Sequence, residues 1–354
     1  PAAILMEAST GQVIYEKDAD TVLHPASITK IMTLILIFDA LNSGKINLTD
    51  DVTVSEYAAS MGGSQVFLEP GETQTVETMI KCISVASAND ACVAMAELIA
   101  GSEEGFVAKM NERAKGLGMN DTTFVNCCGL DVDGHMTTAY DVALMSRELT
   151  TKYPQIHNYS TIWMDTITHV TRRGSEEFGL TNTNKLIRQY QYATGLKTGS
   201  TSLAKYCVSA TAVKDGMELI AVILKGKTSP ERFADAQTLL NYGFASYALK
   251  TVIPDEPLPP VPVTLGTQAT VQPVLGEENQ LLLEKAKTGE LSQSVTLESS
   301  VQAPVAVGDR LGTLTVTFGE EVLVELPLLA GEEVPRITFR QMLPRVLRIA
   351  CLVE

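Results

Sequence analysis

The chain has 354 residues, of which 45% are hydrophobic, and a formal net charge of −15. This length and apolar content allow two domains, each with a core of its own. The acidic balance disfavours nucleic-acid binding, which requires basic stripes. The longest apolar run, at 31–41, is interrupted by Thr33 and Asp39 and falls short of the roughly 20 residues of a membrane-spanning helix. We therefore expect a soluble, globular protein with more than one domain.

A candidate nucleophile and base stand at the start of the first helical pattern. Ser27-Ile28-Thr29-Lys30 leads into apolar residues that recur at helical spacing. A serine hydroxyl needs a base within hydrogen-bond reach to act as a nucleophile, and residues three apart share one face of a helix. Ser27 and Lys30 are therefore expected to meet. The alternative is a plain helix N-cap serine.

Two further motifs lie where the chain changes direction. Ser87-Ala88-Asn89 falls between two helical patterns and is predicted to form a helix–helix turn. Lys197-Thr198-Gly199 ends a strand-like run, and a hairpin with arms at 207–213 and 219–224 follows it. Lys287-Thr288-Gly289 repeats this motif beyond a proline-rich segment, where an exposed loop is predicted.

The first motif also has a second copy, Ser202-Leu203-Ala204-Lys205. It leads into the β-branched run at 207–213, which predicts a strand. Residues three apart in a strand point to opposite faces. We therefore expect this copy to have no catalytic role.

In this order, the motifs S-x-x-K, S-x-N and K-T-G resemble the signature of penicillin-binding proteins and class A β-lactamases. The flanking residues at 25–33, 87–96 and 195–199 are similar to those of the low-molecular-mass D-alanyl-D-alanine carboxypeptidases. Gly129-Leu130-Asp131 and Ser9-Thr10-Gly11-Gln12-Val13 add to this resemblance, which runs through most of the chain. It implies an α/β catalytic domain of the serine β-lactamase/transpeptidase-like fold, with helices packed on an antiparallel sheet.

The resemblance also implies a mechanism. Ser27 would attack the carbonyl between the two terminal D-alanines of a peptidoglycan stem peptide, Lys30 would take its proton, and Ser87 would relay that proton to the leaving nitrogen. The substrate-binding residues would be Asn89, Lys197, Thr198, Gly199, Ser200 and Arg232. Backbone N–H groups of Ser27 and Ser200 would stabilise the developing oxyanion. β-Lactam antibiotics would acylate the same serine. Arg232 is assigned by its position after the second hairpin arm, and a surface helix residue is an equal alternative.

Three other functions would use the same motifs. A class A β-lactamase needs a glutamate in a Glu-x-x-Leu-Asn loop, but Glu177 is followed by Thr181 where the asparagine should stand. A β-lactam sensor or scaffold without turnover is disfavoured by the complete set of motif residues, although deacylation is not readable from sequence. A D,D-endopeptidase that acts on cross-links would use identical residues.

Cysteines and histidines do not point to a metal or a cofactor. Cys82, Cys92 and Cys207 lie in helix or strand patterns, which favours buried free thiols over a disulfide framework. The neighbours Cys127 and Cys128 are not expected to bond each other. The four histidines show no metal-ligand spacing. We therefore expect no metal site, and the resemblance implies no cofactor.

A proline-dense segment at 253–262 predicts an extended connector between two domains. The first, at 1–252, carries all three motifs. The second, at 253–335, consists of short alternating runs separated by turn residues, which predict a small β-sandwich.

The last segment, at 336–354, has apolar residues at helical spacing together with Arg340, Arg345 and Arg348. This pattern is typical of a basic amphipathic helix that binds an anionic membrane surface, although Pro344 lies inside it. The alternative is a helix docked on its own domain. The resemblance favours the anchor, and it implies an extracytoplasmic protein, secreted through a removed signal peptide and held peripherally on the outer face of the cytoplasmic membrane.

One position departs from the family pattern. A glycine usually precedes the tyrosine of the strand after K-T-G, whereas this chain has Lys205-Tyr206. We expect a local difference in backbone or charge near the pocket, which would affect substrate preference rather than the reaction.

Overall fold

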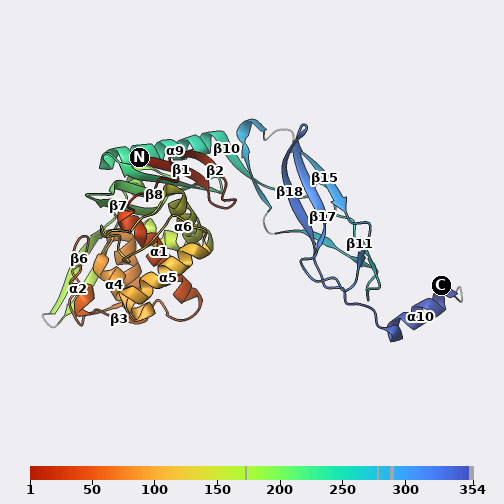
Figure 1. The fold of residues 1–354 in the computed structure, drawn as a ribbon, viewed down its shortest axis with the longest axis horizontal. Helices are drawn as coiled ribbons and strands as arrows, with labels where there is room; N and C mark the ends of the chain where they lie inside the picture. Colours follow the sequence, from red (N-terminus) through yellow and green to blue (C-terminus); the bar gives the residue numbers. More distant parts are fainter. Residues whose placement is uncertain (172–173, 277–278, 288–290, 351–354) are drawn as a thin grey trace. The chain divides into compact units, whose positions relative to one another are not determined.

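The computed structural model describes residues 1–171, 174–276, 279–287 and 291–350, with the backbone alone at 345 and 347–350. Packing divides the chain into two compact units, Pro1–Ala245 and Ser246–Glu354 (Figure 1). Thr288 and Gly289 of the second K-T-G copy lie outside the described residues, as does Cys351.

The first unit is built on a five-stranded antiparallel sheet with the strand order β2-β1-β9-β8-β7. The start of the chain supplies β1 (Ala2–Glu7) and β2 (Val13–Lys17), and the end of the unit supplies β7 (Ala193–Thr201), β8 (Lys205–Lys214) and β9 (Met217–Gly226). This order leaves β2 and β7 as the two edge strands. The prediction of an antiparallel sheet made from both ends of the segment is therefore confirmed.

Helices cover both faces of this sheet (Figure 1). On one face α9 (Ser229–Ser246) lies against β1 and β9, where Gly243 abuts Leu5 and Leu219. On the other face α6 (Ala139–Lys152) is joined to β8 by a buried hydrogen bond of 2.8 Å between the Ser146 and Ser209 hydroxyls. The remaining helices lie on the side of α6.

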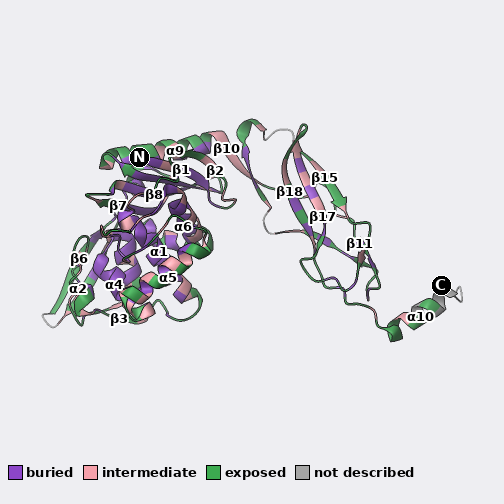
Figure 2. Ribbon diagram, viewed as in Figure 1, coloured by how far each residue is buried: buried purple, intermediate pink, exposed green. Residues whose placement is uncertain are grey.

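The central helix of that side is α1 (Lys30–Asn42), whose residues from Lys30 to Phe38 are all buried. A helix that is apolar on every side is typical of a core position, and Figure 2 shows α1 and α4 as largely buried. The other elements of the unit are η1 (Ala26–Thr29), β3 (Asp51–Thr53), α2 (Glu56–Ala59), β4 (Thr73–Thr75), α3 (Val76–Lys81), η2 (Cys82–Ala86), α4 (Asn89–Ala100), α5 (Glu103–Gly116), η3 (Pro154–Ile156), α7 (His157–Ser160), β5 (Met164–Thr171), β6 (Gly174–Thr181) and α8 (Leu186–Gln189).

The second unit is mainly β-structure, as predicted. One sheet has the order β12-β11-β16, another has the order β13-β18-β17-β15, and β10 pairs with β14. The bounds are β10 (Tyr247–Thr251), β11 (Val261–Thr264), β12 (Thr270–Val271), β13 (Pro273–Leu275), β14 (Gln280–Glu284), η4 (Lys285–Lys287), β15 (Leu291–Leu297), β16 (Val301–Gln302), β17 (Arg310–Phe318) and β18 (Glu321–Ala330). Because β10 pairs with β14, packing places it in this unit, one strand before the boundary that the proline-dense segment predicts.

The last described element is α10 (Phe339–Ala350), which contains Pro344. Apolar side chains on it are open to solvent: Phe339 is 76% exposed, Leu343 47% and Val346 53%. The side chains of Arg345 and Arg348 lie outside the described residues. Within the described ranges, no helix combines the length and the apolar composition that crossing a membrane requires.

Five cysteines, Cys82, Cys92, Cys127, Cys128 and Cys207, are buried with free thiols, as the sequence predicts. The Cys127 and Cys128 sulfurs lie 3.6 Å apart, too far for a disulfide bond.

Candidate active site

The half-buried Ser27 and the fully buried Lys30 meet at the start of α1. Ser27 lies in the 3₁₀ turn η1, and Lys30 is the first residue of α1. Side chains three apart eclipse each other in a 3₁₀ helix, so this turn aligns the pair more closely than the expected α-helical turn would. The fully buried Lys30 Nζ donates to Ser27 Oγ at 2.9 Å and to the Cys128 carbonyl at 2.7 Å. Ser27 caps neither helix with its side chain, so the N-cap alternative is wrong.

Two glycines allow other segments to approach the Ser27 turn. Gly129, at φ +88°, abuts the carbonyl group of Ala26, so that a Cβ atom at this position would overlap it. A Cβ atom at Gly199 would lie 2.9 Å from the Ser27 nitrogen. The turn is thus clamped between the loop at 126–130 and strand β7. Any larger residue at either position would displace it.

The loop at 126–130 also holds the partner of Lys30, which sequence reasoning missed. Asn126 Oδ1 accepts hydrogen bonds from the N–H groups of Cys128, Gly129 and Leu130 at 3.1, 2.7 and 3.1 Å. These bonds shape the loop that presents the Cys128 carbonyl to Lys30. The resemblance at Gly129-Leu130-Asp131 pointed to this loop, but it gave none of the loop residues a role in holding Lys30.

A buried histidine stabilises the Ser27 turn through Thr29. His135 Nδ1 accepts the Val125 N–H at 2.9 Å, so Nε2 carries the proton and donates to Thr29 Oγ1 at 2.8 Å. The Thr29 hydroxyl in turn donates to the Ala26 carbonyl at 2.8 Å. Burial, followed by the neighbouring His24, lowers the pKa of His135 to about 4. The sequence had considered His135 only as a metal ligand.

The second motif supplies two polar atoms that lack partners. Ser87 lies between η2 and α4 in a left-handed conformation, with φ +63°. Asn89 Nδ2 donates to the Gly62 carbonyl at 2.7 Å. Ser87 Oγ and Asn89 Oδ1 are both buried without a hydrogen-bond partner among the described residues. Buried polar atoms rarely stay unpaired, so this pair is suited to a ligand.

The third motif lies on the edge strand β7, beside the Ser27 turn. Lys197 is 1% exposed, and burial, with the charge of Lys30 as the next cause, lowers the pKa of Lys197 well below its usual value. Thr198 Oγ1 donates to Thr183 Oγ1 at 2.7 Å. Ser200 is exposed at the end of the strand. An edge strand offers unpaired backbone groups to an extended peptide.

Arg232 is tied to the same strand. It is only 7% exposed, so the surface-helix alternative is wrong. Its Nη1 donates to the carbonyls of Gly199 and Cys207 at 2.8 and 2.9 Å, and its guanidinium lies over the rings of Tyr206 and Phe233. Arg232 therefore joins the ends of β7 and β8 next to the K-T-G motif.

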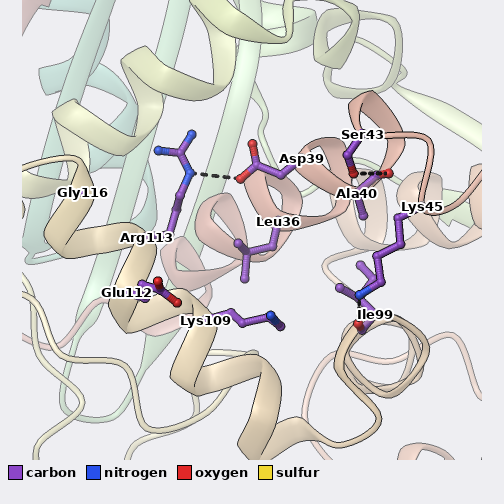
Figure 3. Close-up of a pocket in the computed structure, with 10 residues that line it drawn as sticks. All are labelled: Leu36, Asp39, Ala40, Ser43, Lys45, Ile99, Lys109, Glu112, Arg113 and Gly116. Atoms are coloured by element: carbon purple, nitrogen blue, oxygen red, sulfur yellow. Dashed lines mark hydrogen bonds and ion pairs between the residues drawn. The ribbon is translucent and has the colours of Figure 1, made fainter.

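A separate hollow of about 460 Å³ lies at the other end of α1, facing α5 (Figure 3). Arg113 Nε pairs with Asp39 there at 3.0 Å, and Lys45 donates to the Ile99 carbonyl at 2.6 Å. None of the predicted site residues lines it. This hollow is therefore not the site that the three motifs predict.

Possible metal ligands gather at one place in the described part of the chain: Glu103, Cys127 and Cys128, whose ligand atoms lie within 4.8 Å of one another. The Glu103 carboxylate accepts the Cys127 N–H at 3.0 Å and the Tyr57 hydroxyl at 2.6 Å. The bond to Glu103 raises the pKa of Tyr57 to about 12. The carboxylate thus ties α5 and the Tyr57 segment to the loop at 126–130.

Residues 1–228 match the peptidase S11 family model, described as D-alanyl-D-alanine carboxypeptidase. The chain belongs to this family. Residues 249–336 match the model of the C-terminal domain of penicillin-binding protein 5. The protein is therefore a serine-type carboxypeptidase, a peptide hydrolase with an appended β-rich domain.

Individual members of the D-alanyl-D-alanine carboxypeptidase family agree over nearly the whole chain. DacF of Bacillus subtilis is 42% identical over 98% of this chain and 88% of its own length. DacC of Escherichia coli is 35% identical over 94% of this chain and 84% of its own length. Among solved structures, penicillin-binding protein 5 of Haemophilus influenzae superposes with a TM-score of 0.82 at 27% identity, covering 95% of this chain and 97% of that one.

The copy Ser202-Leu203-Ala204-Lys205 lies in the turn between β7 and β8. Ser202 Oγ is 3.4 Å from Asp131 Oδ2, and no hydrogen bond to Lys205 is found among the described side chains. Lys205 is exposed and has φ +57°, in the left-handed region that favours glycine. Where the family usually has glycine, this chain thus has Lys205, and its backbone keeps the left-handed conformation that glycine favours.

Proposed function

We propose that this carboxypeptidase removes the terminal D-alanine of peptidoglycan stem pentapeptides through an acyl-enzyme on Ser27, and that β-lactam antibiotics acylate the same residue. The 2.9 Å bond between the fully buried Lys30 and Ser27 Oγ carries this proposal. A serine with a base at this distance satisfies the geometric requirement of nucleophilic catalysis.

The reaction begins when Ser27 Oγ attacks the carbonyl carbon and passes its proton to the Lys30 amine. The oxyanion forms between the backbone N–H groups of Ser27 and Ser200. Ser87 relays the proton from Lys30 to the leaving nitrogen, the C–N bond breaks and D-alanine departs. Water then hydrolyses the ester, which restores the serine.

Substrate binding uses the free edge of β7 and the unpaired atoms of the second motif. The extended peptide pairs with the strand beside Gly199 and Ser200. Asn89 holds its amide. The terminal carboxylate lies toward Lys197 and Thr198, with the Arg232 guanidinium behind the strand adding positive charge.

The test is incubation of the full chain with a fluorescent penicillin and, separately, with a pentapeptide that ends in D-Ala-D-Ala. We expect one covalent adduct on Ser27 by intact mass and peptide mapping, together with release of free D-alanine. A cross-linked peptide dimer is the matched substrate for endopeptidase activity. The proposal is wrong if no adduct forms on Ser27 or if the dimer is cleaved and the pentapeptide is not.

We also propose an extracytoplasmic location, with α10 as a peripheral anchor to anionic lipid. The support is the exposure of Phe339, Leu343 and Val346 together with the basic residues of the segment. Each arginine near an anionic surface contributes about 1 kcal/mol. Removal of residues 336–354 should abolish cosedimentation with anionic liposomes, while pentapeptide hydrolysis continues. If full-length protein ignores liposomes and the truncation lowers the melting temperature, α10 instead stabilises its own domain.

A further inference from the structure

A hollow of about 520 Å³ lies where β7 ends and β8 begins, directly beyond the K-T-G motif. Its lining includes Ser200, whose backbone belongs to the proposed oxyanion site, and two lysines, Lys205 and Lys227. Lys205 opens β8, and Lys227 follows β9. The two lysines thus lie at the open end of the β8–β9 hairpin, where Tyr206 pairs with Gly226, and both line the hollow.

The charge of this hollow is not balanced by acidic groups. Its lining contains no aspartate or glutamate. Within the described part of the chain, neither lysine forms an ion pair. The nearby Asp131 carboxylate is occupied by Thr201 Oγ1 at 2.7 Å and by the Ser202 turn. The hollow is thus lined by two cations in a protein of net charge −15.

The backbone at Lys205 gives an independent reason to look for a ligand. Its φ of +57° is disfavoured for a residue with a side chain and free of cost for glycine. Strained backbone positions tend to cluster at binding sites, so the strain at Lys205 points to a ligand for its side chain.

The direction of the substrate strand connects the hollow to the reaction. This step rests on the proposed function. The terminal carboxylate lies toward Lys197 and Thr198, and the scissile carbonyl lies at Ser27 and Ser200. The part of the peptide before the scissile bond must therefore continue past Ser200, toward Thr201 and the hollow. Ser200 and Thr201 themselves line the hollow, so the residues just before the scissile bond lie beside it.

We propose that Lys205 and Lys227 form an anion subsite for a carboxylate on the acyl side of the scissile bond. In a stem peptide this is a free carboxylate of a residue before the two D-alanines. In a β-lactam it is a carboxylate on the acylamino side chain. The subsite selects among substrates and takes no part in the bond-breaking step.

Benzylpenicillin and carbenicillin are matched probes, because carbenicillin carries one additional carboxylate on its side chain. The measurement is the second-order rate constant of Ser27 acylation for each, in the full-length protein and in Lys227→Met, Lys205→Gly and the double variant. Relative to wild type, the ratio of the carbenicillin to the benzylpenicillin constant should fall about 3-fold in each single variant and about 10-fold in the double variant. Lys205→Gly also removes the strain, so a loss there reflects the missing ammonium group rather than misfolding.

Lys17→Met is the control, because Lys17 is an exposed lysine on β2, the opposite edge strand. It should leave both rate constants unchanged. Raising the salt concentration should lower the ratio in wild type and leave it constant in the double variant, since exposed charges are screened. The anion subsite is excluded if the ratio is the same in wild type and in the double variant while benzylpenicillin still acylates Ser27. Failure of both penicillins to acylate wild-type Ser27 would instead refute the proposed function.

Discussion

Two tetrads of the same pattern, Ser27 to Lys30 and Ser202 to Lys205, have opposite environments in this protein. In the first, the lysine is fully buried and bonded to the serine. In the second, the lysine is exposed at the start of a strand, and the serine faces Asp131. The difference shows that the pattern alone does not make a nucleophile. Ser27 differs from Ser202 in its 3₁₀ turn, in the buried carbonyl that holds Lys30 and in the two close glycines.

The largest effect should come from removing the nucleophile of the buried tetrad. Ser27→Ala should lower penicillin acylation and D-alanine release by roughly 10⁴-fold or more, because it removes the hydroxyl that Lys30 Nζ reaches at 2.9 Å. Ser202→Ala is the matched change in the other tetrad and should acylate normally. Intact mass after incubation with a fluorescent penicillin measures both. An adduct that persists in Ser27→Ala and disappears in Ser202→Ala would reverse the comparison.

Removing the base should have the next largest effect. Lys30→Ala should lower the acylation rate by about 10²–10⁴-fold and leave a folded protein, because general-base catalysis has this magnitude. Lys45→Ala is the control: Lys45 also donates to a backbone carbonyl, but it does so at the far end of α1. Stopped-flow acylation and circular dichroism give the two readouts. A Lys30→Ala variant with a normal pH–rate profile would show that another base acts.

The clamp around the Ser27 turn can be tested at Gly129. Gly129→Ala should lose at least about 3 kcal/mol of stability or displace the serine and slow acylation, because the new Cβ overlaps the Ala26 carbonyl group. Gly134→Ala has a similar φ of +84° but meets nothing closer than Val125 Cγ2 at 4.0 Å, so it should lose about 1 kcal/mol through strain alone. Urea unfolding measures the stability lost by each variant, and acylation rates measure the effect of each on Ser27. Equal losses would mean that the close approach has no energetic consequence.

A smaller, pH-dependent effect should come from His135. A pKa of about 4 in the folded state, against about 6.5 in the unfolded chain, means that the unfolded state binds more protons between these values. Stability should therefore fall by about 3 kcal/mol as the pH is lowered from 6.5 to 4. His135→Gln keeps a donor and an acceptor but does not titrate, so its slope in this window should be shallower. Parallel curves for wild type and variant would show that His135 is not responsible.

How much of the site was predictable from sequence depends on the range of its contacts. The Ser27 and Lys30 pair was readable because helical periodicity is local, and the order of the three motifs indicated their assembly. The supports of the turn were not readable. Asn126, His135 and Cys128 act through a loop at 126–135 that is distant in the chain, and Cys128 acts through its carbonyl, which every residue type possesses.

The sequence by itself determined the alternation of helices and strands, the β-rich second unit and the pairing of Ser27 with Lys30, because these follow from periodicity. Only the tertiary structure decided which backbone carbonyl receives Lys30 and where Arg232 lies. It also decided that β10 packs with the second unit. The physical reason is that burial, edge position and hydrogen bonding to backbone atoms depend on which distant segments meet.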